Sequence, residues 1–481
     1  MVRALITSKD PSASWRDVIK GTSRVGELSA VNLLDKNHNK MTTHNLVADY
    51  SDSTAVHLKV EGASTPSTPP TNPVVPPVAP PVNPTPPANP PVTSVGTFAE
   101  ATKHTNQTSS LAIALALDKI LASGNGLGTA LDMHIQDLHI QNDSQALTEL
   151  VQSLQPAMNA QATHVVSEQQ NIATQAVIDR VFGARLDTTQ GSDNDHRPFR
   201  RGDDVGSQVW VQGLGIKHKM DAKNSFAGYD GNSYGLIVGA DSLVGDGLRL
   251  GAALSYSDSD VDSVGTVNHQ SLKSDNIQAF IYGDYATTDE THYNGFVSYG
   301  RSDVKTERRL SLAGISDIAK GEYDANILQA GVGIDHRIGS HDKHVSPYAQ
   351  LRYTRIKNDG YTEQGGLAQL NFVVDKQTYD SLKATLGVHF AQPLSERLGV
   401  VGHLAGHVEN ADDLAVNTSF ATMPSVSFTE TGRQKKKFSV GTGMGLRYQM
   451  GMNTEITGQY AGEFRSGAKD HGAVVMVKWK Y

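Results

Sequence analysis

The sequence predicts a twelve-stranded antiparallel transmembrane β-barrel with a lumen-spanning α-helix, preceded by a helical linker and a Pro-rich spacer. Three observations predict this all-β dominated fold. First, 36 of the 45 glycines lie in residues 202–481, among segments in which apolar and polar residues alternate. Second, the connections between these segments alternate between long and short. Third, no segment approaches the ~18 apolar residues of a membrane helix, whereas alternating strands leave average hydropathy unremarkable.

Composition excludes several classes of function. The 481 residues carry 42 Lys+Arg against 50 Asp+Glu, a net charge of −8, which gives no basic surface for nucleic acid. Cysteine is absent, so disulfides, thiolate metal sites and cysteine nucleophiles are all excluded. The longest apolar run, Leu111 to Ala122, is short and contains Asp118, which excludes a helical membrane protein. We expect neither a cofactor nor a metal.

The N-terminal third of the chain changes composition twice. Residues 1–62 are polar, with one or two expected strands, and we interpret them as a stub or the remnant of an exported passenger. No basic and apolar leader follows Met1, so no signal peptide is predicted, and we expect either that the sequence begins within a longer protein or that its reading frame is truncated. Residues 63–95 hold thirteen of the 19 prolines, all between Pro66 and Pro91, and predict a disordered, semi-rigid spacer.

Helical periodicity follows the spacer. Residues 96–145 predict a helical linker, and residues 146–186 a long α-helix that Pro156 is expected either to kink or to split in two. One face of the long helix is rich in amides and nearly uncharged, which fits either a soluble amphipathic helix or a helix inside a polar lumen. Under the second interpretation, the residues expected to contact the lumen wall are Gln152, Gln161, Gln169, Gln175 and Arg180.

Alternating segments fill the rest of the chain, residues 205–481. In one of them, Ile277 and Ile281 share a face opposite Gln278 and Phe280, which is typical of a strand. Aromatic residues near strand ends are expected to form the interfacial girdles: Trp210, Tyr256, Tyr285, Tyr299, Tyr353 and Trp479. The twelve expected strands are 207–219, 233–244, 248–260, 272–286, 291–304, 321–338, 345–358, 371–391, 397–410, 435–450, 453–465 and 470–481.

The expected connections separate into two kinds. Long loops are predicted at 220–232, 261–271, 305–320, 359–370 and 411–434, and short turns lie between them. Long loops on one side and tight turns on the other are typical of outer-membrane barrels. An even number of strands also returns both ends of the barrel to the same side of the membrane.

The last strand ends on an aromatic residue. Four of its residues share one face, Val475, Val477, Trp479 and Tyr481, while Lys478 and Lys480 lie on the other. We interpret the four as the signal by which the barrel is assembled.

This order of parts resembles the C-terminal half of an autotransporter, a type V secretion protein. The segments ALALDKIL, ALTELVQSLQP and IDRVFGARL are similar to the helical segment that precedes such barrels. The resemblance implies a monomeric translocator in the outer membrane of a Gram-negative bacterium, with its N-terminal part at the cell surface. The implied partners are the barrel-assembly machinery, periplasmic chaperones, the lipid bilayer and the chain's own passenger polypeptide. Residues 146–186 lack the Asn-Asn pair at which some members cut themselves, so we expect no such cleavage.

No catalytic residues are predicted. Ser233 matches the pattern G-x-S-x-G but lacks the strand-to-helix turn that the motif requires. His403 and His407 share a face of a strand, where their spacing is ~13 Å and unsuited to one metal ion. Two alternatives stay open. The first is an outer-membrane esterase or protease whose catalytic passenger is missing, and the second is a surface adhesin acting through extracellular loops such as 305–320 and 411–434.

Overall fold

The computed structural model describes residues 14–20, 44–49, 55–62 and 97–480, except residues 125, 142, 185–206, 246, 313–314, 341–342 and 452. The chain divides into two compact units, residues 1–88 and 89–481. The first unit contains the antiparallel strands β1 (Ser14–Lys20), β2 (His44–Asp49) and β3 (Ala55–Gly62), in the order β1–β3–β2. The described part of this unit therefore holds three strands, more than the one or two expected.

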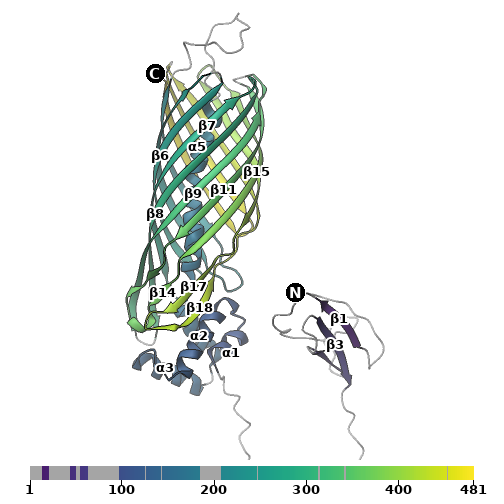
Figure 1. Cartoon of the computed structure of the whole chain (residues 1–481), viewed down its shortest axis with the longest axis vertical. Coiled ribbons are helices and arrows are strands. Elements are labelled where there is room, and N and C mark those ends of the chain that lie inside the picture. The colour runs from purple at the N-terminus through teal and green to yellow at the C-terminus, as the bar shows by residue number, and fades with distance from the viewer. Residues whose placement is uncertain are drawn as a thin grey trace, which may run out of the picture. The chain divides into compact units, whose positions relative to one another are not determined.

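Short helices open the second unit (Figure 1): α1 (Phe98–His104), α2 (Leu111–Ala122), α3 (Thr129–Gln141) and α4 (Ser144–Leu154). The Asp118 carboxylate of α2 accepts hydrogen bonds from the backbone N–H groups of Phe98 and Ala99, at 2.8 and 3.0 Å. It therefore caps the first turn of α1, which explains an acidic residue in an apolar helix. Asp143 caps α4 by accepting from the Ala146 N–H at 3.0 Å.

Twelve antiparallel strands then close into a barrel, as predicted. Strand β21 pairs with β4, from Lys480 opposite Gln208 to Ala468 opposite Met220, so the described barrel has no open edge. The strands are β4 (Gln208–Met220), β5 (Gly228–Leu243), β6 (Leu248–Val264), β7 (Gln270–Ala286), β8 (Thr291–Leu312), β9 (Ile315–His336), β11 (His344–Asn358), β15 (Gln377–Pro393), β16 (Leu398–Ala411), β19 (Phe438–Met450), β20 (Thr454–Arg465) and β21 (Ala468–Lys480).

The alternation predicted for the strands is confirmed in their burial. On β7, Ile277 and Ile281 are 62% and 70% exposed, whereas Gln278 and Phe280 are at most 2% exposed. Apolar residues thus cover the outside of the barrel and mainly polar ones line the lumen, the pattern of a barrel in lipid. None of the described helices combines the length and the apolar character needed to cross a bilayer.

Two of the expected long loops are corrected by the structure. Residues 305–320 mostly continue β8 and β9, which are 22 residues long each and pair as far as Leu312 opposite Ile315. Their outward charges, such as Glu307 and Lys320 paired at 3.0 Å, concealed the strand pattern because this part projects beyond the apolar band. Within 411–434, strands β17 (Ala415–Phe420) and β18 (Met423–Thr431) form a hairpin.

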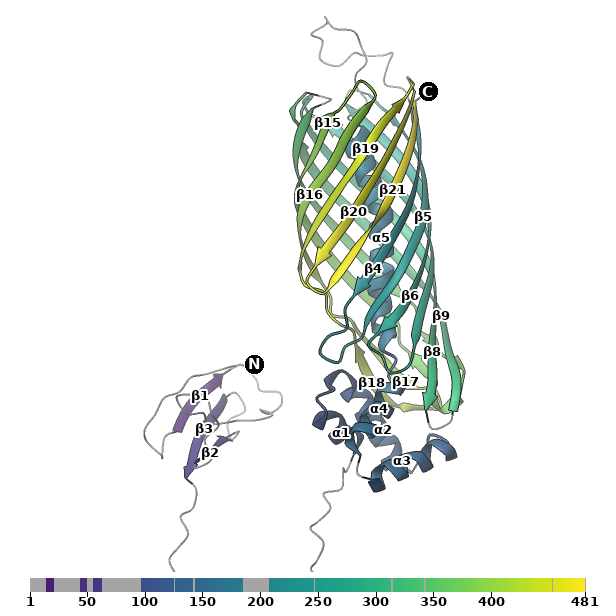
Figure 2. The same cartoon turned by 180° about the vertical axis from the view of Figure 1, so that it is seen from behind.

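The hairpin belongs to a small sheet at one mouth of the barrel. Its order is β12 (Tyr361–Thr362), β14 (Phe372–Val374), β17 and β18. The phenyl rings of Phe372, Phe420 and Phe428 pack edge-on or tilted and join the apolar core of α1–α4. Helix α2 packs on β18, so the short helices dock on this mouth (Figure 2). Small remaining strands are β10 (Ile338–Gly339) and β13 (Gln364–Gly365).

Aromatic residues border the apolar band. Tyr256 and Tyr299 are more than half exposed, and the Tyr256 hydroxyl donates to Asp275 at 2.7 Å across the neighbouring strand. Tyr285 and Trp479 border the opposite edge, 48% and 41% exposed. The assignment of Trp210 to a girdle is wrong, because its side chain is fully buried inside the barrel.

Candidate functional site: a lumen filled by one helix

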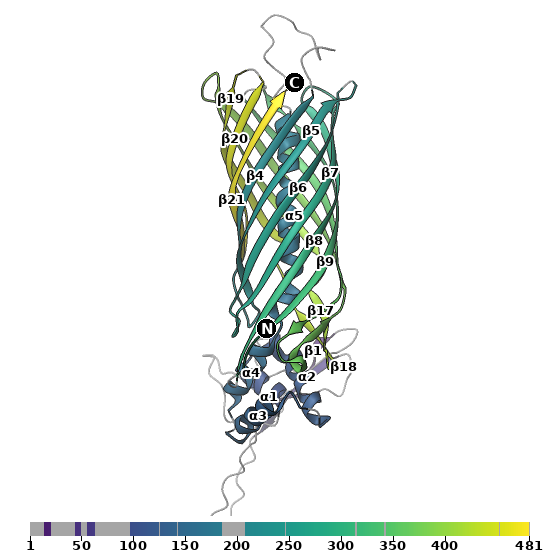
Figure 3. The same ribbon diagram turned by 90° about the vertical axis from the view of Figure 1, so that its left-hand side faces the viewer.

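Helix α5 (Ala157–Ala184) lies inside the barrel along its axis (Figure 3). Its 28 residues rise by ~1.5 Å each, so the helix is ~42 Å long and exceeds the ~25 Å apolar band of such barrels. Side chains around the whole circumference are buried, among them Ala160, Gln161 and Gln169. A helix enclosed by a polar wall has no solvent-facing stripe, which explains amides on a face where a soluble helix would carry charges.

The break between α4 and α5 falls at Gln155 and Pro156. Gln155 has extended backbone angles, φ −64° and ψ 125°, because the residue before a proline avoids the helical region. Its amide donates to the Ser109 carbonyl at 3.2 Å and to the Glu430 carboxyl at 2.8 Å. The side chain of Gln270 donates to the Gln155 carbonyl at 2.8 Å. The turn into the lumen is therefore tied both to the short helices and to the barrel.

The expected lumen contact of Gln152 is corrected by this break. Gln152 lies on α4, and its amide donates to the side chain of Gln107 at 2.9 Å, within the group of short helices. The helical pattern is split at Pro156 into α4 and α5, one of the two expected outcomes, and α4 packs with the other short helices at the mouth.

Glu430 is the buried acid of the mouth. Its side chain is 1% exposed, and Oε2 has no hydrogen-bond partner among the described residues. Burial raises the pKa of Glu430 to about 8, although the hydrogen bond from Gln155 acts in the opposite direction. At neutral pH this carboxyl is mostly protonated, which removes the cost of burying a charge there.

Two amides of α5 bind the barrel in its middle section. Gln161 donates to the Ala227 carbonyl at 3.2 Å. Gln169 donates to the carbonyls of Ser257 and Ser274 at 2.9 and 3.0 Å and accepts from the Ser274 hydroxyl at 2.9 Å. These amides satisfy buried backbone carbonyls without placing a charge in the lumen.

One ion pair joins α5 to the loop between β18 and β19. Glu168 pairs with Lys435, and their side chains are 7% and 9% exposed. Close by, the wall carries its own network, in which Glu463 pairs with Lys383 at 2.5 Å and also with Arg465. The wall charges are thus paired with one another, whereas Lys435 is paired with the helix.

A second charged network holds the other end of α5. Arg180 contacts the carboxylate of Asp241 at 2.8 Å and also donates to Gln208. Arg249 reaches the same carboxylate at 2.7 Å, so one buried acid serves two guanidinium groups. The sequence offered only a weak signal for Asp241, its inward position in the alternation of strand β5.

Trp210 completes this network from the first strand. Its indole N–H donates to the Tyr282 hydroxyl at 2.8 Å, and that hydroxyl donates to Asp241 at 2.8 Å. Gly239 leaves the space that the indole occupies, because a Cβ there would meet the ring at 2.5 Å. The tryptophan is therefore a lumen residue that orients an acid.

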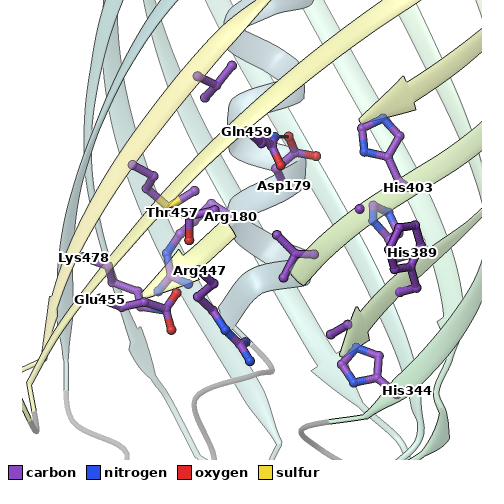
Figure 4. Close-up of a pocket in the computed structure, with 16 residues that line it drawn as sticks. Asp179, Arg180, His344, His389, His403, Arg447, Glu455, Thr457, Gln459 and Lys478 are labelled. Carbon is purple, nitrogen blue, oxygen red and sulfur yellow. Dashed lines mark hydrogen bonds and ion pairs between the residues drawn. The ribbon is translucent and has the colours of Figure 1, made fainter. Parts of the chain in front are cut away.

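A cavity of about 100 Å³ remains beside the C-terminal part of α5 (Figure 4). Gln175 donates to Asp179 at 2.8 Å, and Gln459 of β20 donates to the same carboxylate at 3.0 Å. Gln175 thus reaches the wall only through Asp179. The opposite side of the cavity carries three histidines, His344, His389 and His403. The helix backbone approaches β5–β8 more closely than the barrel strands β16, β19, β20 and β21, which leaves this space open.

The residues interpreted as an assembly signal lie on β21. Val475 and Trp479 are 52% and 41% exposed and point out of the barrel, and Val477 on the same face is partly exposed. Lys478 on the other face is buried and pairs with Glu455 at 3.0 Å. Tyr481 lies outside the described residues.

Ser233 lies in the lumen wall on β5, beside a histidine and an acid. His218 Nε2 is 2.9 Å from the Ser233 hydroxyl, and His218 Nδ1 is 2.6 Å from Asp470. This order resembles that of a hydrolase triad, but Ser233 is fully buried and its hydroxyl also bonds Ser259. Ladder pairing uses the backbone N–H groups of these strands, which leaves no donors for an oxyanion. The arrangement is a buried polar network.

The histidines singled out in the sequence do not converge. His407 lies 2.9 Å from the Thr385 hydroxyl, and the rings of His389 and His403 are 5.6 Å apart. In the described part of the chain, no three histidine or acidic side chains are placed to hold a metal ion.

Comparison with known families supports the barrel assignment. A family model described as "Autotransporter beta-domain" matches residues 209–461. The translocator domain of the autotransporter NalP from Neisseria meningitidis has a similar fold, with a TM-score of 0.54 at 18% identity, over 68% of this chain and 100% of that one.

Curated relatives are much longer than this chain. An extracellular serine protease of Serratia marcescens is 27% identical over 58% of this chain, but only 26% of the relative is covered. Outer membrane protein A of Rickettsia rickettsii is 24% identical over 64% of this chain and 14% of that protein. The match therefore concerns a minor part of each relative.

Proposed function

This chain belongs to the autotransporter β-domain family, and on that premise we propose that its barrel exports the polypeptide N-terminal to α5 and keeps α5 as the plug. The barrel is an outer-membrane translocator domain of a Gram-negative bacterium. The single observation that carries the proposal is that α5 fills a closed barrel and joins a folded group of helices at one mouth (Figure 1).

The two mouths differ in a way that supports a direction of export. Strand β4 begins, and β21 ends, at the mouth where the connections between barrel strands are short, which faces the periplasm in barrels of this type. The short helices α1–α4 lie at the other mouth, so residues 97–155 end at the cell surface together with what precedes them.

Assembly of the barrel is part of the same proposal. Val475, Val477 and Trp479 form an apolar outward face on the strand that closes the barrel, and Tyr481 follows them. We expect the barrel-assembly machinery to bind this strand, with periplasmic chaperones acting before insertion. The translocator domain itself is not catalytic. The relative named as an extracellular serine protease favours, as the second candidate, an enzymatic passenger.

The test uses the full chain behind a signal peptide, with an epitope in the 63–95 spacer. We expect protease added to intact cells to remove the epitope and leave a barrel whose gel mobility shifts on boiling. Deleting residues 479–481 should abolish both the removal of the epitope by protease and the shift in gel mobility, because the protein is degraded in the periplasm. An epitope that stays protected while the barrel is folded would contradict export.

A further inference from the structure

The loop between β18 and β19 bends into the mouth and rests on α5. Gly432 donates its N–H to the Leu414 carbonyl at 2.8 Å. A Cβ at Gly432 would lie 3.1 Å from the Leu414 side chain and 3.2 Å from the Ala160 carbonyl oxygen of α5, so a larger residue would require the loop or the helix to shift by a few tenths of an ångström. Leu414 itself is fully buried and belongs to the apolar cluster that joins Met158 and Val166 of the helix to the barrel wall.

Lys435, three residues further, carries the charge that meets the helix. Its ammonium group pairs with Glu168, which also accepts a hydrogen bond from Asn171 at 3.2 Å. Both charges are about nine-tenths buried, so each depends on the other. Among the described residues, Glu168 is the carboxylate within ion-pair distance of Lys435.

The charged side chains of the neighbouring wall are paired with one another and not with the helix. Lys383 and Arg465 both contact Glu463, and Arg465 also contacts Glu409 at 3.2 Å. These pairs persist in an empty lumen, because all their members belong to barrel strands. If α5 were absent, Lys435 would lose its carboxylate partner and Leu414 would lose its apolar neighbours on the helix. The barrel would then carry an unpaired charge, and an apolar side chain that faces the lumen.

We propose that residues 432–435 form a clasp that closes on α5, with Glu168 as the positioning residue that draws Lys435 inward. This inference rests on the proposed export function. While a passenger occupies the lumen, the clasp lies outward, because a passing chain offers neither a fixed carboxylate nor the Leu414 contact. When Glu168 reaches the level of Lys435, the ion pair forms, the clasp closes and the helix stops in register.

Ion conductance of the full-length protein in planar bilayers tests the clasp. Glu168→Gln and Lys435→Met should each increase the frequency of open events by about tenfold or more, because each leaves one buried charge or acceptor without its partner. The charge swap Glu168→Lys with Lys435→Glu should return the frequency of open events to within about threefold of that of the unmodified protein. Lys305→Met, which removes an exposed charge paired with Glu322, is the matched control and should change nothing.

Two outcomes would overturn the clasp. One is an unchanged conductance in both single variants. The other is a charge-swap variant whose open events are as frequent as those of the single variants. In both cases the heat-dependent gel shift must show that the barrel is folded. Because the sequence lacks cysteine, Glu168→Cys with Lys435→Cys also allows a clean cross-link, expected only in chains whose export is complete. Protease removal of the spacer epitope, measured in parallel, distinguishes a failure of the clasp proposal from a failure of the export proposal. If the epitope is removed but no variant alters gating, only the clasp fails, and if it stays protected the export proposal fails.

Discussion

The two ends of α5 are held in different ways. At the mouth, Met158 and Val166 pack among apolar side chains that include Met220 and Leu414. At the periplasmic end, Val177 and Val181 also pack among apolar side chains, but there Arg180 in addition depends on one acid, Asp241, that a second arginine shares. Apolar packing tolerates any side chain of similar volume, whereas a buried charge cluster fails when one member is removed. The two ends should therefore respond differently to substitution.

The largest effect is expected at the periplasmic end. Asp241→Asn leaves two buried guanidinium groups without their anion and should lower stability by about 3–5 kcal/mol. The measurement is the temperature at which the folded gel mobility is lost. Glu322→Gln, which breaks an exposed pair with Lys305, is the control and should leave that temperature unchanged. Equal behaviour of the two variants would remove the contrast between buried and exposed pairs.

At the mouth, volume should matter more than identity. Leu414→Ala opens a cavity against α5 and should cost about 2–4 kcal/mol, whereas Leu414→Met should cost less than about 1.5 kcal/mol. Urea unfolding followed by the same gel shift measures both. A methionine variant as damaged as the alanine variant would show that the mouth requires one exact shape.

The mouth should also respond to pH, through Glu430. Its pKa is raised in the folded protein to about 8, so its contribution to stability is fully present below the ordinary pKa near 4.5 and is lost as the pH rises to 8. Docking of the short helices should weaken by about 2 kcal/mol between pH 6 and 9. Protease cleavage within residues 97–155, measured against pH, reports this, and Glu430→Gln should abolish the dependence. A parent whose cleavage is independent of pH would contradict it.

The smallest effect is expected outside the lumen. Tyr256→Phe removes one hydrogen bond to Asp275 from a half-exposed ring and should cost less than about 1 kcal/mol. Its apolar ring stays at the membrane boundary, so insertion should be normal. A loss as large as that of Asp241→Asn would mean that the girdle hydroxyls hold the strand register.

The strands within the apolar band could be predicted from the sequence, because lipid outside and a polar lumen inside impose a period of two. Ile277 and Gln278 show that contrast directly. The same rule fails beyond the bilayer, where both faces are polar. Glu307 and Lys320 therefore resembled a loop, although cross-strand ion pairs hold them in a ladder.

Contacts within the lumen were less predictable. The amides of Gln161 and Gln169 are on the predicted helix and meet barrel carbonyls, but no periodicity indicates which ones. Glu430, Lys435 and Asp241 are far from the helix in sequence and were missed. A single acidic residue on an inward face gives no local signal, because its importance comes from partners that only closure of the barrel brings near.

The unequal heights of the barrel wall give the exit a direction. Strands β8 and β9 are 22 residues long and β20 is 12, so at ~3.3 Å per residue and a tilt of ~40° one side rises roughly 25 Å above the other (Figure 2). Helix α4 contacts the tall side, at β8. We expect a polypeptide that leaves the pore to be blocked on the tall flank, so that it departs toward the side where the strands are short, along the cell surface rather than straight away from it.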